Sequence, residues 1–303
     1  MAVIAVSGAS GFIGMHLCPD LIARGHQVIA VSRAQLMATD LAASLAGAGV
    51  FIHLAGRAHV LRDMAANPEA AFRVANLQLT QTVATAAARA QVQRLVFLSS
   101  AGVLGRSSPK GGFTDHSPPA PHDAYTRTKL EAEHWLRSEA QPRMEIVILR
   151  PPLVYGWGAR GNFARLFRAV QAGWPLPIGA LDAPRSMLGI RNLIDLVHVA
   201  AVDPRAAGHT MLAADAETTT VAAFARELGA QMGCPPRLMQ VPKWLVTLLL
   251  RASGRTADVG RLTEPFELCP TVARAALGWS PPFSLAQELA QVVSRDASEQ
   301  HRS

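Results

Sequence analysis

Two neighbouring side chains have the types and the spacing of a proton-transfer site. Tyr125 and Lys129 stand four positions apart, so on a helix both project from one face, one turn from each other. A free phenol has a pKa of about 10, and an adjacent ammonium favours the phenolate and lowers that pKa. Ser100 lies 25 positions earlier (125 − 100). The spacing predicts that Tyr125 moves a proton with help from Lys129, although an isolated pair of this kind also occurs on exposed helix faces.

A glycine-rich turn near the N-terminus favours the chemical interpretation. The apolar run 2–6 ends in Ser-Gly-Ala-Ser-Gly-Phe-Ile-Gly, which places Gly8, Gly11 and Gly14 three positions apart. Such glycines allow a tight turn, let a pyrophosphate approach the backbone and let the helix pack on its strand. The helix that follows offers free N–H groups and a positive dipole to phosphates. We therefore expect a dinucleotide at this turn.

Ser100 follows a second apolar run, residues 94–98, which is typical of a buried parallel strand. Ligands of doubly wound sheets bind beyond the carboxyl ends of the strands, and Ser99 and Ser100 lie there. The alternative is that both hydroxyls only satisfy backbone groups at the strand end. Between Ser100 and Tyr125 the chain is rich in Pro, Gly and Ser, which predicts a loop at the mouth of the site.

Together these residues resemble the extended short-chain dehydrogenase/reductase family, the NAD-dependent epimerase/dehydratase proteins, over almost the whole chain. Further matching segments are His53–Gly56, Val74–Asn76, Leu149–Gly156, Pro175–Gly179, Arg185-Ser186 and Ile190–Leu196. The resemblance implies an α/β fold with a Rossmann-type doubly wound parallel sheet and a smaller C-terminal substrate-binding lobe. It also implies a set of cofactor-binding residues: Gly8, Ser10, Gly11, Phe12, Ile13, Gly14, Leu54, Ala55, Gly56, Pro152 and Leu153, with Tyr125 and Lys129 at the nicotinamide ribose.

The order of helix and strand patterns agrees with that fold. Strands are expected at Gln27–Val31, Val50–Leu54 and Glu145–Leu149, and helices at Met15–Ala23, Ala70–Gln91 and from Tyr125 to about Ser138. We expect a dinucleotide-binding domain at 1–155 with a return segment at about 186–214. The substrate lobe would comprise 156–185 and 215–293, followed by a frayed polar tail at 294–303.

Composition limits the alternatives. Half of the 303 residues are hydrophobic, which suits a large core, and the net charge of +7 comes from dispersed basic residues rather than a nucleic-acid-binding run. Cys18, Cys234 and Cys269 lack metal-site or disulfide spacing and are expected to be reduced, buried thiols, and no metal is expected. No signal peptide or membrane span is apparent, which predicts a cytoplasmic protein. The apolar segment Lys243–Arg251 is expected to be a buried helix, with interfacial membrane contact as the alternative.

The cofactor type depends on the end of the second expected strand. Relatives that prefer NAD place an acidic residue on the adenosine ribose there, whereas this chain has Ser32 and Arg33. A hydroxyl and a guanidinium suit a 2′-phosphate, so NADP(H) is the expected cofactor and NAD(H) the alternative. The linker between Arg33 and Val50 is short for the family. Asp40 in that linker is expected to cap a helix at 41–46 rather than contact adenine.

For the reaction, the resemblance implies hydride exchange between nicotinamide and a sugar carbon, with Tyr125 moving the proton and Ser100 donating a hydrogen bond to the reacting oxygen. Asn76 either supports the site or only starts a helix. Ala101-Gly102 follow Ser100 where dehydratases of the family carry an Asp-Glu pair, so dehydration is not expected.

Ser32-Arg33 and the look of segments 55–62, 113–129 and 185–196 resemble bacterial reductases of UDP-4-keto-6-deoxy-N-acetylhexosamine, which supply surface polysaccharide. UDP-hexose 4-epimerisation with bound NAD ranks second, and a non-catalytic cofactor-sensing regulator is the hypothesis from another class. Ser100, Asn162, Arg185 and Arg261 are the expected contacts of the UDP-sugar. The family's Asn after the Arg150 strand has no counterpart. A homodimer is common in the family, although no residue here proves one.

Overall fold

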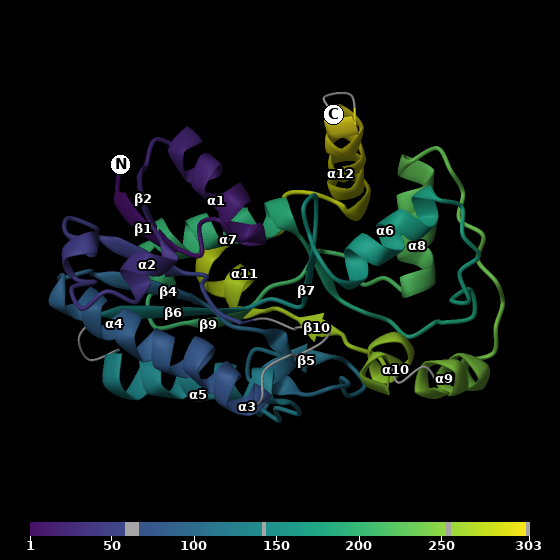
Figure 1. Cartoon of the computed structure of the whole chain (residues 1–303), viewed down its shortest axis with the longest axis horizontal. Helices are drawn as coiled ribbons and strands as arrows, with labels where there is room; N and C mark the ends of the chain where they lie inside the picture. Colours follow the sequence, from purple (N-terminus) through teal and green to yellow (C-terminus); the bar gives the residue numbers. More distant parts are fainter. Residues whose placement is uncertain (58–66, 141–143, 253–255, 301–303) are drawn as a thin grey trace.

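The computed structural model describes residues 1–57, 67–140, 144–252 and 256–300. Its centre is a sheet of six parallel strands in the order β2-β1-β3-β4-β6-β9 (Figure 1). The expected α/β fold with a doubly wound parallel sheet is confirmed. The strands of this sheet are β1 Val3–Ser7, β2 Gln27–Val31, β3 Val50–His53, β4 Arg94–Leu98, β6 Glu145–Arg150 and β9 Thr210–Leu212.

The strand order reverses beside β1. Ser7, the last residue of β1, pairs with Val31 of β2 on one side and with His53 of β3 on the other. In a doubly wound sheet this switch point opens a crevice beyond the carboxyl ends of the strands. The glycine turn after β1 and the segment 54–56 after β3 therefore meet at one crevice.

Helices cover both faces of the sheet because successive strand residues point to opposite sides. On β1, Ile4 and Val6 pack into a core with α1 (Phe12–Ala23) and α7 (Ile190–Val202), whereas Ala5 faces α4 (Leu79–Arg89) and α5 (Ala124–Trp135). The short linker 34–49 holds α2 (Arg33–Leu36) and a 3₁₀ turn at Ala43–Leu45.

The helix expected at 70–91 is continuous but changes pitch. It begins as α3 (Pro68–Phe72), widens into a π-helical turn at Arg73–Gln78 and continues as α4. The helix α5 likewise ends in a π-helical turn at Leu136–Ala140. Such turns are frequent at functional sites, and the first one carries Asn76.

The remaining chain forms a smaller lobe, at the right of Figure 1. Its core is aromatic: Tyr155, Phe163 and Phe224 pack edge to face or tilted. The elements outside the main sheet are β5 Phe113–Thr114, β7 Leu153–Tyr155, β8 Met187–Gly189, β10 Leu268–Cys269, α6 Asn162–Gln171, α8 Val221–Gln231, α9 Lys243–Ala252, α10 Thr256–Thr263, α11 Val272–Leu277 and α12 Leu285–Gln300, with 3₁₀ turns at Ala101–Leu104 and Pro204–Ala206.

The domain division read from the sequence stays a proposal: β9 and α7 lie against the main sheet as expected for the return segment, whereas Ala273 and Leu277 of α11 pack into the main-sheet core although 215–293 was expected to belong to the lobe. Three expectations are corrected. The helix α12 continues to Gln300, so 294–300 is helical rather than frayed, and 301–303 lie outside the described residues. Cys269 is exposed and Cys18 and Cys234 are half-buried, although all three are free thiols. The helix α9 buries only Val246 among its residues. Across the described parts of the chain, no helix is both long and apolar enough to span a bilayer.

Candidate active site

The glycine turn is shaped by close backbone contacts. Gly8 adopts a φ of +73°, and a Cβ there would lie 2.9 Å from the backbone nitrogen of Ala55. A Cβ on Gly14 would lie 2.3 Å from the carbonyl oxygen of Gly8, so only glycine lets α1 start this close to the strand. Gly11 caps α1 without a side-chain acceptor, which leaves the first N–H groups of the helix available to a phosphate. These residues fit a dinucleotide.

Ser100 stands at the carboxyl end of β4. It caps the 3₁₀ turn Ala101–Leu104, and its hydroxyl accepts a hydrogen bond from the backbone nitrogen of Gly102 at 3.1 Å. The same side chain hydrogen-bonds the phenol of Tyr125. A Cβ on Gly102 would lie 2.9 Å from the Thr126 methyl, so the glycine lets the turn approach α5. The structure thus brings together two residues that are 25 positions apart in the sequence.

Tyr125 and Lys129 are fixed by the start of α5. Asp123 caps this helix, with its carboxylate accepting from the backbone nitrogen of Thr126 at 2.8 Å in a capping box. One turn further on, Lys129 is buried with its ammonium nitrogen 4.2 Å from the centre of the Phe97 ring. Glu133, another turn along, forms a buried ion pair with Arg150 and accepts from the Ser99 hydroxyl.

The electrostatics of the pair differ from the expectation. Burial raises the pKa of Tyr125 to about 12, against the opposing effect of the Ser100 hydrogen bond, and the Asp123 carboxylate raises it further. Burial lowers the pKa of Lys129 to about 7, although the Glu133 carboxylate opposes that shift. The predicted lowering of the tyrosine pKa by Lys129 is therefore wrong for the protein without ligand, where burial outweighs the opposing effects. At neutral pH Tyr125 is a phenol.

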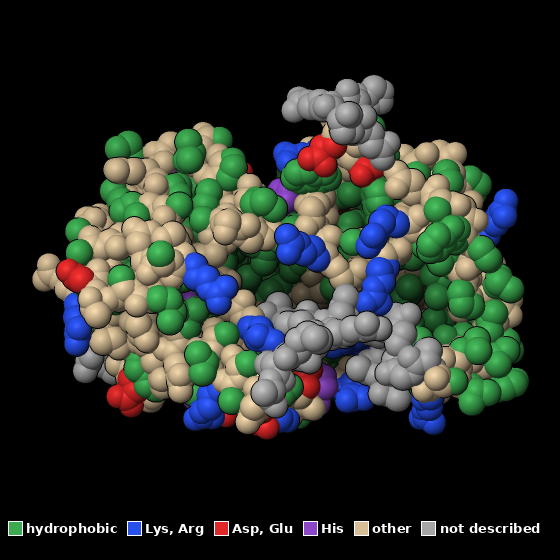
Figure 2. Space-filling view, viewed as in Figure 1, with side chains coloured by type: hydrophobic (Ala, Val, Ile, Leu, Met, Phe, Trp, Pro, Cys, Tyr) green, Lys and Arg blue, Asp and Glu red, His purple; other side chains and the backbone are tan. Residues whose placement is uncertain are grey.

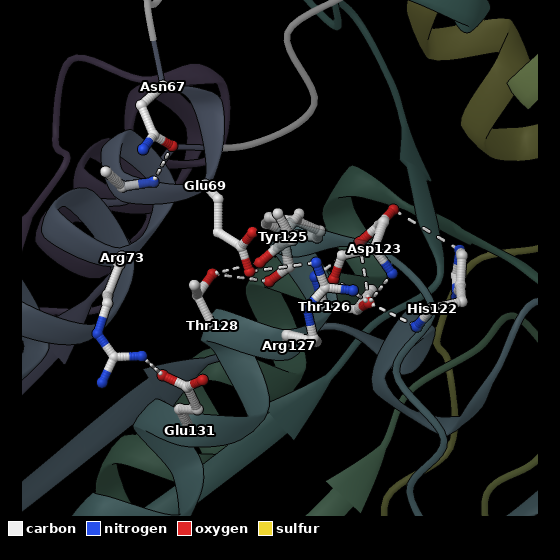
Figure 3. Close-up of polar contacts among 12 residues, drawn as sticks. Asn67, Glu69, Arg73, His122, Asp123, Tyr125, Thr126, Arg127, Thr128 and Glu131 are labelled. Carbon is white, nitrogen blue, oxygen red and sulfur yellow. Dashed lines mark hydrogen bonds and ion pairs between the residues drawn. The ribbon is translucent and has the colours of Figure 1, made fainter.

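The outer side of α5 is tied to the preceding helix by exposed ion pairs. Arg127 reaches Glu69 at 3.3 Å, and Glu131 reaches Arg73 at 2.6 Å (Figure 3). Each exposed pair contributes about 0 to 1 kcal/mol. They align the helix, whereas the buried contacts on its inner side position Tyr125 and Lys129.

A chain of buried hydrogen bonds runs beneath the site. The backbone nitrogen of Ala55 donates to the Ser7 hydroxyl at 3.3 Å, and that hydroxyl contacts Nδ1 of His53 at 2.7 Å. Nε2 of His53 contacts the Thr80 hydroxyl at 3.1 Å, which itself donates to the Asn76 carbonyl oxygen at 2.6 Å. Since Thr80 donates its one proton to Asn76, His53 must carry its proton on Nε2 and accept from Ser7 on Nδ1. Burial and the nearby Lys129 lower the pKa of His53 to about 3, so the ring is neutral.

Asn76 extends this chain to the catalytic helix. Its amide oxygen accepts from the backbone nitrogen of Arg57 at 2.8 Å, and its amide nitrogen donates to the Thr128 hydroxyl at 3.2 Å. Thr128 lies between Tyr125 and Lys129 on α5 and bonds the Tyr125 carbonyl oxygen at 2.9 Å. A Cβ on Gly56 would lie 2.9 Å from the Asn76 amide oxygen and 3.9 Å from Nζ of Lys129. Asn76 therefore supports the site rather than only starting a helix.

At the end of β2, Ser32 caps the short helix α2 in a capping box with Gln35, and Ser32 and Arg33 are both exposed. Asp40 accepts a hydrogen bond from the backbone nitrogen of Ala43 at 3.2 Å, but the helix expected at 41–46 is only a 3₁₀ turn at Ala43–Leu45, whose N-cap residue is Ala42. Asp40 also lines a surface hollow of about 400 Å³ between residues 38–42 and α4.

Three arginines gather around α10. Arg185 donates to the Glu264 carbonyl oxygen at 2.9 Å and lies over the Phe266 ring. Burial and the neighbouring Arg261 lower the pKa of Arg185 to about 10. Cδ of Arg106 lies 3.2 Å from the position that a Cβ on Gly260 would occupy. The charges of Arg106 and Arg261 both lower the pKa of His122, which precedes the N-cap residue of α5. Figure 2 shows Lys and Arg side chains around a hollow in the middle of the molecule.

The sequence analysis missed Arg106 and the polar chain through Ser7, His53 and Thr80. Arg106 lies in the loop that the sequence predicts at the mouth of the site, and this position is the sequence feature that could have indicated it. Among the expected contacts, Asn162 begins α6, and Pro152 and Leu153 follow β6. Residues 58–62 of the reductase-like segment lie outside the described residues. The described residues hold no cluster of three or more potential metal ligands.

Comparison with known proteins agrees with this geometry. The sequence profile of the "NAD dependent epimerase/dehydratase family" matches residues 4–214. A UDP-glucose 4-epimerase of Vibrio cholerae is 33% identical over 308 residues, covering 96% of this chain and 94% of the relative.

Solved structures agree in fold. MoeE5 in complex with UDP-glucuronic acid and NAD has a TM-score of 0.78 at 22% identity, covering 98% of this chain and 99% of its own. RMD from Pseudomonas aeruginosa complexed with NADPH has a TM-score of 0.76 at 20% identity, covering 98% and 100%. The family match and the relative establish that the chain belongs to the NAD-dependent epimerase/dehydratase family, within the extended short-chain dehydrogenase/reductases, and is an NAD(P)-dependent oxidoreductase.

Proposed function

We propose that this protein is an NADPH-dependent reductase of a 4-keto nucleotide sugar, of the UDP-4-keto-6-deoxy-N-acetylhexosamine type, that serves surface polysaccharide synthesis. The observation that carries the proposal is the exposed Arg33 at the end of β2, where a guanidinium suits the 2′-phosphate of a dissociable NADPH rather than a tightly held NAD. Tyr125 is a phenol at neutral pH and is hydrogen-bonded to Ser100, so it can give a proton to a carbonyl oxygen.

The residues of this chain have separate roles in that reaction. The Ser100 hydroxyl donates to the carbonyl oxygen of the sugar, and the Tyr125 hydroxyl gives its proton to the same oxygen as negative charge develops there. Lys129 holds the cofactor ribose from the floor of the site, where Phe97 and Gly56 border its ammonium. A bound nicotinamide supplies the hydride.

The glycine turn and the segment 54–56 would hold the dinucleotide, and two exposed residues would select its form. Ser32 keeps its backbone nitrogen and hydroxyl in the capping box, so Arg33 is the group left to meet a 2′-phosphate. Arg106, Arg185 and Arg261 would hold the diphosphate of the UDP-sugar near the start of α5.

A UDP-hexose 4-epimerase with bound NAD is the second candidate. The Vibrio cholerae relative bears that name, and it aligns with nearly the whole chain. Epimerisation uses the same Tyr125 in both directions of proton transfer. It would require tightly retained NAD, which an exposed Arg33 at the ribose end does not favour.

Two incubations separate the candidates. Purified protein receives UDP-N-acetylglucosamine without added cofactor, or the UDP-4-keto-6-deoxy sugar with NADPH, and NMR identifies the products. NADPH consumption with a new C4 hydroxyl is expected in the second reaction. Epimer formation in the first reaction, with no NADPH consumption in the second, would replace the reductase by the epimerase.

The cofactor preference is tested separately by Arg33→Asp. Removing the guanidinium and adding a carboxylate should weaken NADPH binding by about tenfold or more and favour NADH. Fluorescence titration with each nucleotide measures both affinities, and Arg274→Asp, at an exposed arginine of α11, serves as a control for net charge. Equal NADH and NADPH affinities in the starting protein would remove the proposed preference.

A further inference from the structure

The helix α9 presents an apolar face outward. Trp244, Leu248 and Leu249 are 68%, 55% and 54% exposed, and Val246 is the buried residue of this helix. Single exposed apolar residues are ordinary on protein surfaces, but three large ones within two turns form a contiguous patch. Met239, four residues before the helix, is also 51% exposed. Figure 2 shows hydrophobic side chains gathered over the position of α9, at the lower right.

Basic residues border this patch along the same helix. Lys243, Thr247 and Arg251 recur every four residues and form one row, beside the row of Trp244 and Leu248. Lys243 and Arg251 are exposed. A helix that combines an outward aromatic and leucine face with a basic edge has the pattern of an interfacial amphipathic helix.

The wider segment is free of acidic residues. Between Glu227 and Asp258 the sequence contains four basic residues, Arg237, Lys243, Arg251 and Arg255, and no Asp or Glu. The net charge of +4 over these positions repels other cationic surfaces. A second copy of this chain, with its own net charge of +7, is such a surface. An anionic lipid surface complements both the charge and the apolar face.

We propose that α9 docks the protein onto anionic phospholipid membranes, lying in the headgroup region with Trp244, Leu248 and Leu249 inserted. Ten residues of helix are too short to span a bilayer, so the contact is peripheral. The helix α9 packs against α10, which carries Arg261, so docking places the substrate lobe next to the membrane. This inference concerns a surface apart from Tyr125 and does not depend on the reaction direction.

Vesicle co-sedimentation tests the proposal. The full chain is mixed with vesicles of equal parts phosphatidylglycerol and phosphatidylcholine, or of phosphatidylcholine alone, at low and high salt. Binding is expected to the anionic vesicles, to weaken with salt and to be small on the neutral ones. Absence of binding to anionic vesicles, or equal binding to both kinds, overturns the proposal.

Paired variants locate the contact. Trp244→Ser with Leu248→Ser should reduce anionic-vesicle binding about tenfold or more, and Lys243→Ala with Arg251→Ala should weaken it and flatten its salt dependence. Ile22→Ser with Met37→Ser alters two equally exposed apolar residues of the nucleotide domain and should change nothing. All substituted side chains are exposed, so turnover of a water-soluble substrate should persist.

Sedimentation velocity provides the competing outcome. If Trp244→Ser with Leu248→Ser converts a dimer to a monomer while leaving vesicle binding intact, a second copy covers α9 and the membrane proposal is wrong. Unchanged sedimentation together with lost vesicle binding supports it.

Discussion

The floor of the nucleotide site and the arginine cluster of the substrate lobe are built in opposite ways. Beneath Tyr125, polar groups are buried and partnered: His53 and Asn76 are at most 1% exposed, and each makes hydrogen bonds through both of its polar side-chain atoms. On the lobe side, Arg185 is half-buried, its neighbour Arg261 comes from the short helix α10, and Arg106 packs from a loop against Gly260 of that helix. Buried, satisfied networks fix geometry, whereas arginines at a cleft can adapt to different ligands.

Under the proposed function, the buried region carries the chemical step and the arginine cluster carries substrate specificity. Hydride transfer needs atoms placed within a fraction of an ångström, and the buried network supplies that rigidity. Substrate selection needs positive charge near the bound substrate, on side chains that can still adjust their positions. Substitutions should therefore change turnover in the first region and substrate affinity in the second.

The largest effect is expected from Tyr125→Phe. Loss of the hydroxyl removes the proton donor, and general acid catalysis contributes about 10² to 10⁴-fold. The ring remains, so NADPH affinity should stay within about twofold. Steady-state turnover and nucleotide titration measure the two quantities. Retention of most activity would refute the assignment of Tyr125.

The next largest effect should follow from interrupting the buried hydrogen-bond chain at His53. In His53→Phe the Ser7 and Thr80 hydroxyls lose a buried partner, which costs about 1 to 3 kcal/mol of unfolding free energy. Because the chain ends at Thr128, turnover should also fall about tenfold while the KM for the sugar nucleotide is unchanged. Denaturant titration and kinetics report the two effects.

His53→Gln provides the matched test, because its amide can still donate toward Thr80. It should restore part of the turnover. The wild-type ring stays neutral down to a pKa of about 3, while an unfolded histidine binds a proton below its ordinary pKa of 6.5. Stability is therefore lost as pH falls from 6.5 to 3, and the Gln variant should lose less. Identical acid profiles would show that His53 does not titrate in this way.

Substitutions in the arginine cluster should act on affinity alone. Arg106→Ala should weaken UDP binding by about tenfold without changing NADPH affinity, and Arg185→Ala should do the same. Because Arg185 also bonds the Glu264 backbone, Arg106 is the cleaner probe. Arg205→Ala, an exposed arginine paired with Asp203, is the control. Unchanged calorimetric UDP affinity would remove the cluster from the diphosphate site.

The smallest effect concerns Lys129 in the cofactor-free protein. Its pKa is about 7 in the folded chain, against the ordinary lysine value of 10.5 that applies once the chain unfolds, so between these values the unfolded chain binds more protons. Stability should rise with pH across that window, by at most about 1.4 kcal/mol per pH unit. Lys129→Met should remove this slope, and exposed Lys243→Met should not. Denaturant midpoints from pH 7 to 10 test it, and an unchanged slope in Lys129→Met would assign the titration elsewhere.

The sequence by itself determined the features that depend on local spacing. Each of these features depends only on residues close together in the sequence, and each appears in the structure. They are the glycine positions after a strand, the four-residue step from Tyr125 to Lys129 and the two-residue alternation of strands. The hydrogen bond from Asp40 to a backbone nitrogen of the following turn could be predicted for the same reason.

Only the tertiary structure decided the properties that depend on distant segments. Burial raises the pKa of Tyr125 against the hydrogen bond from Ser100, and Arg106 meets the segment at Gly260 through folding alone. The apolar run of α9 was compatible with a buried helix until its packing left Trp244 outside. Periodicity specifies which face of a helix is apolar, but only packing decides whether another element covers that face.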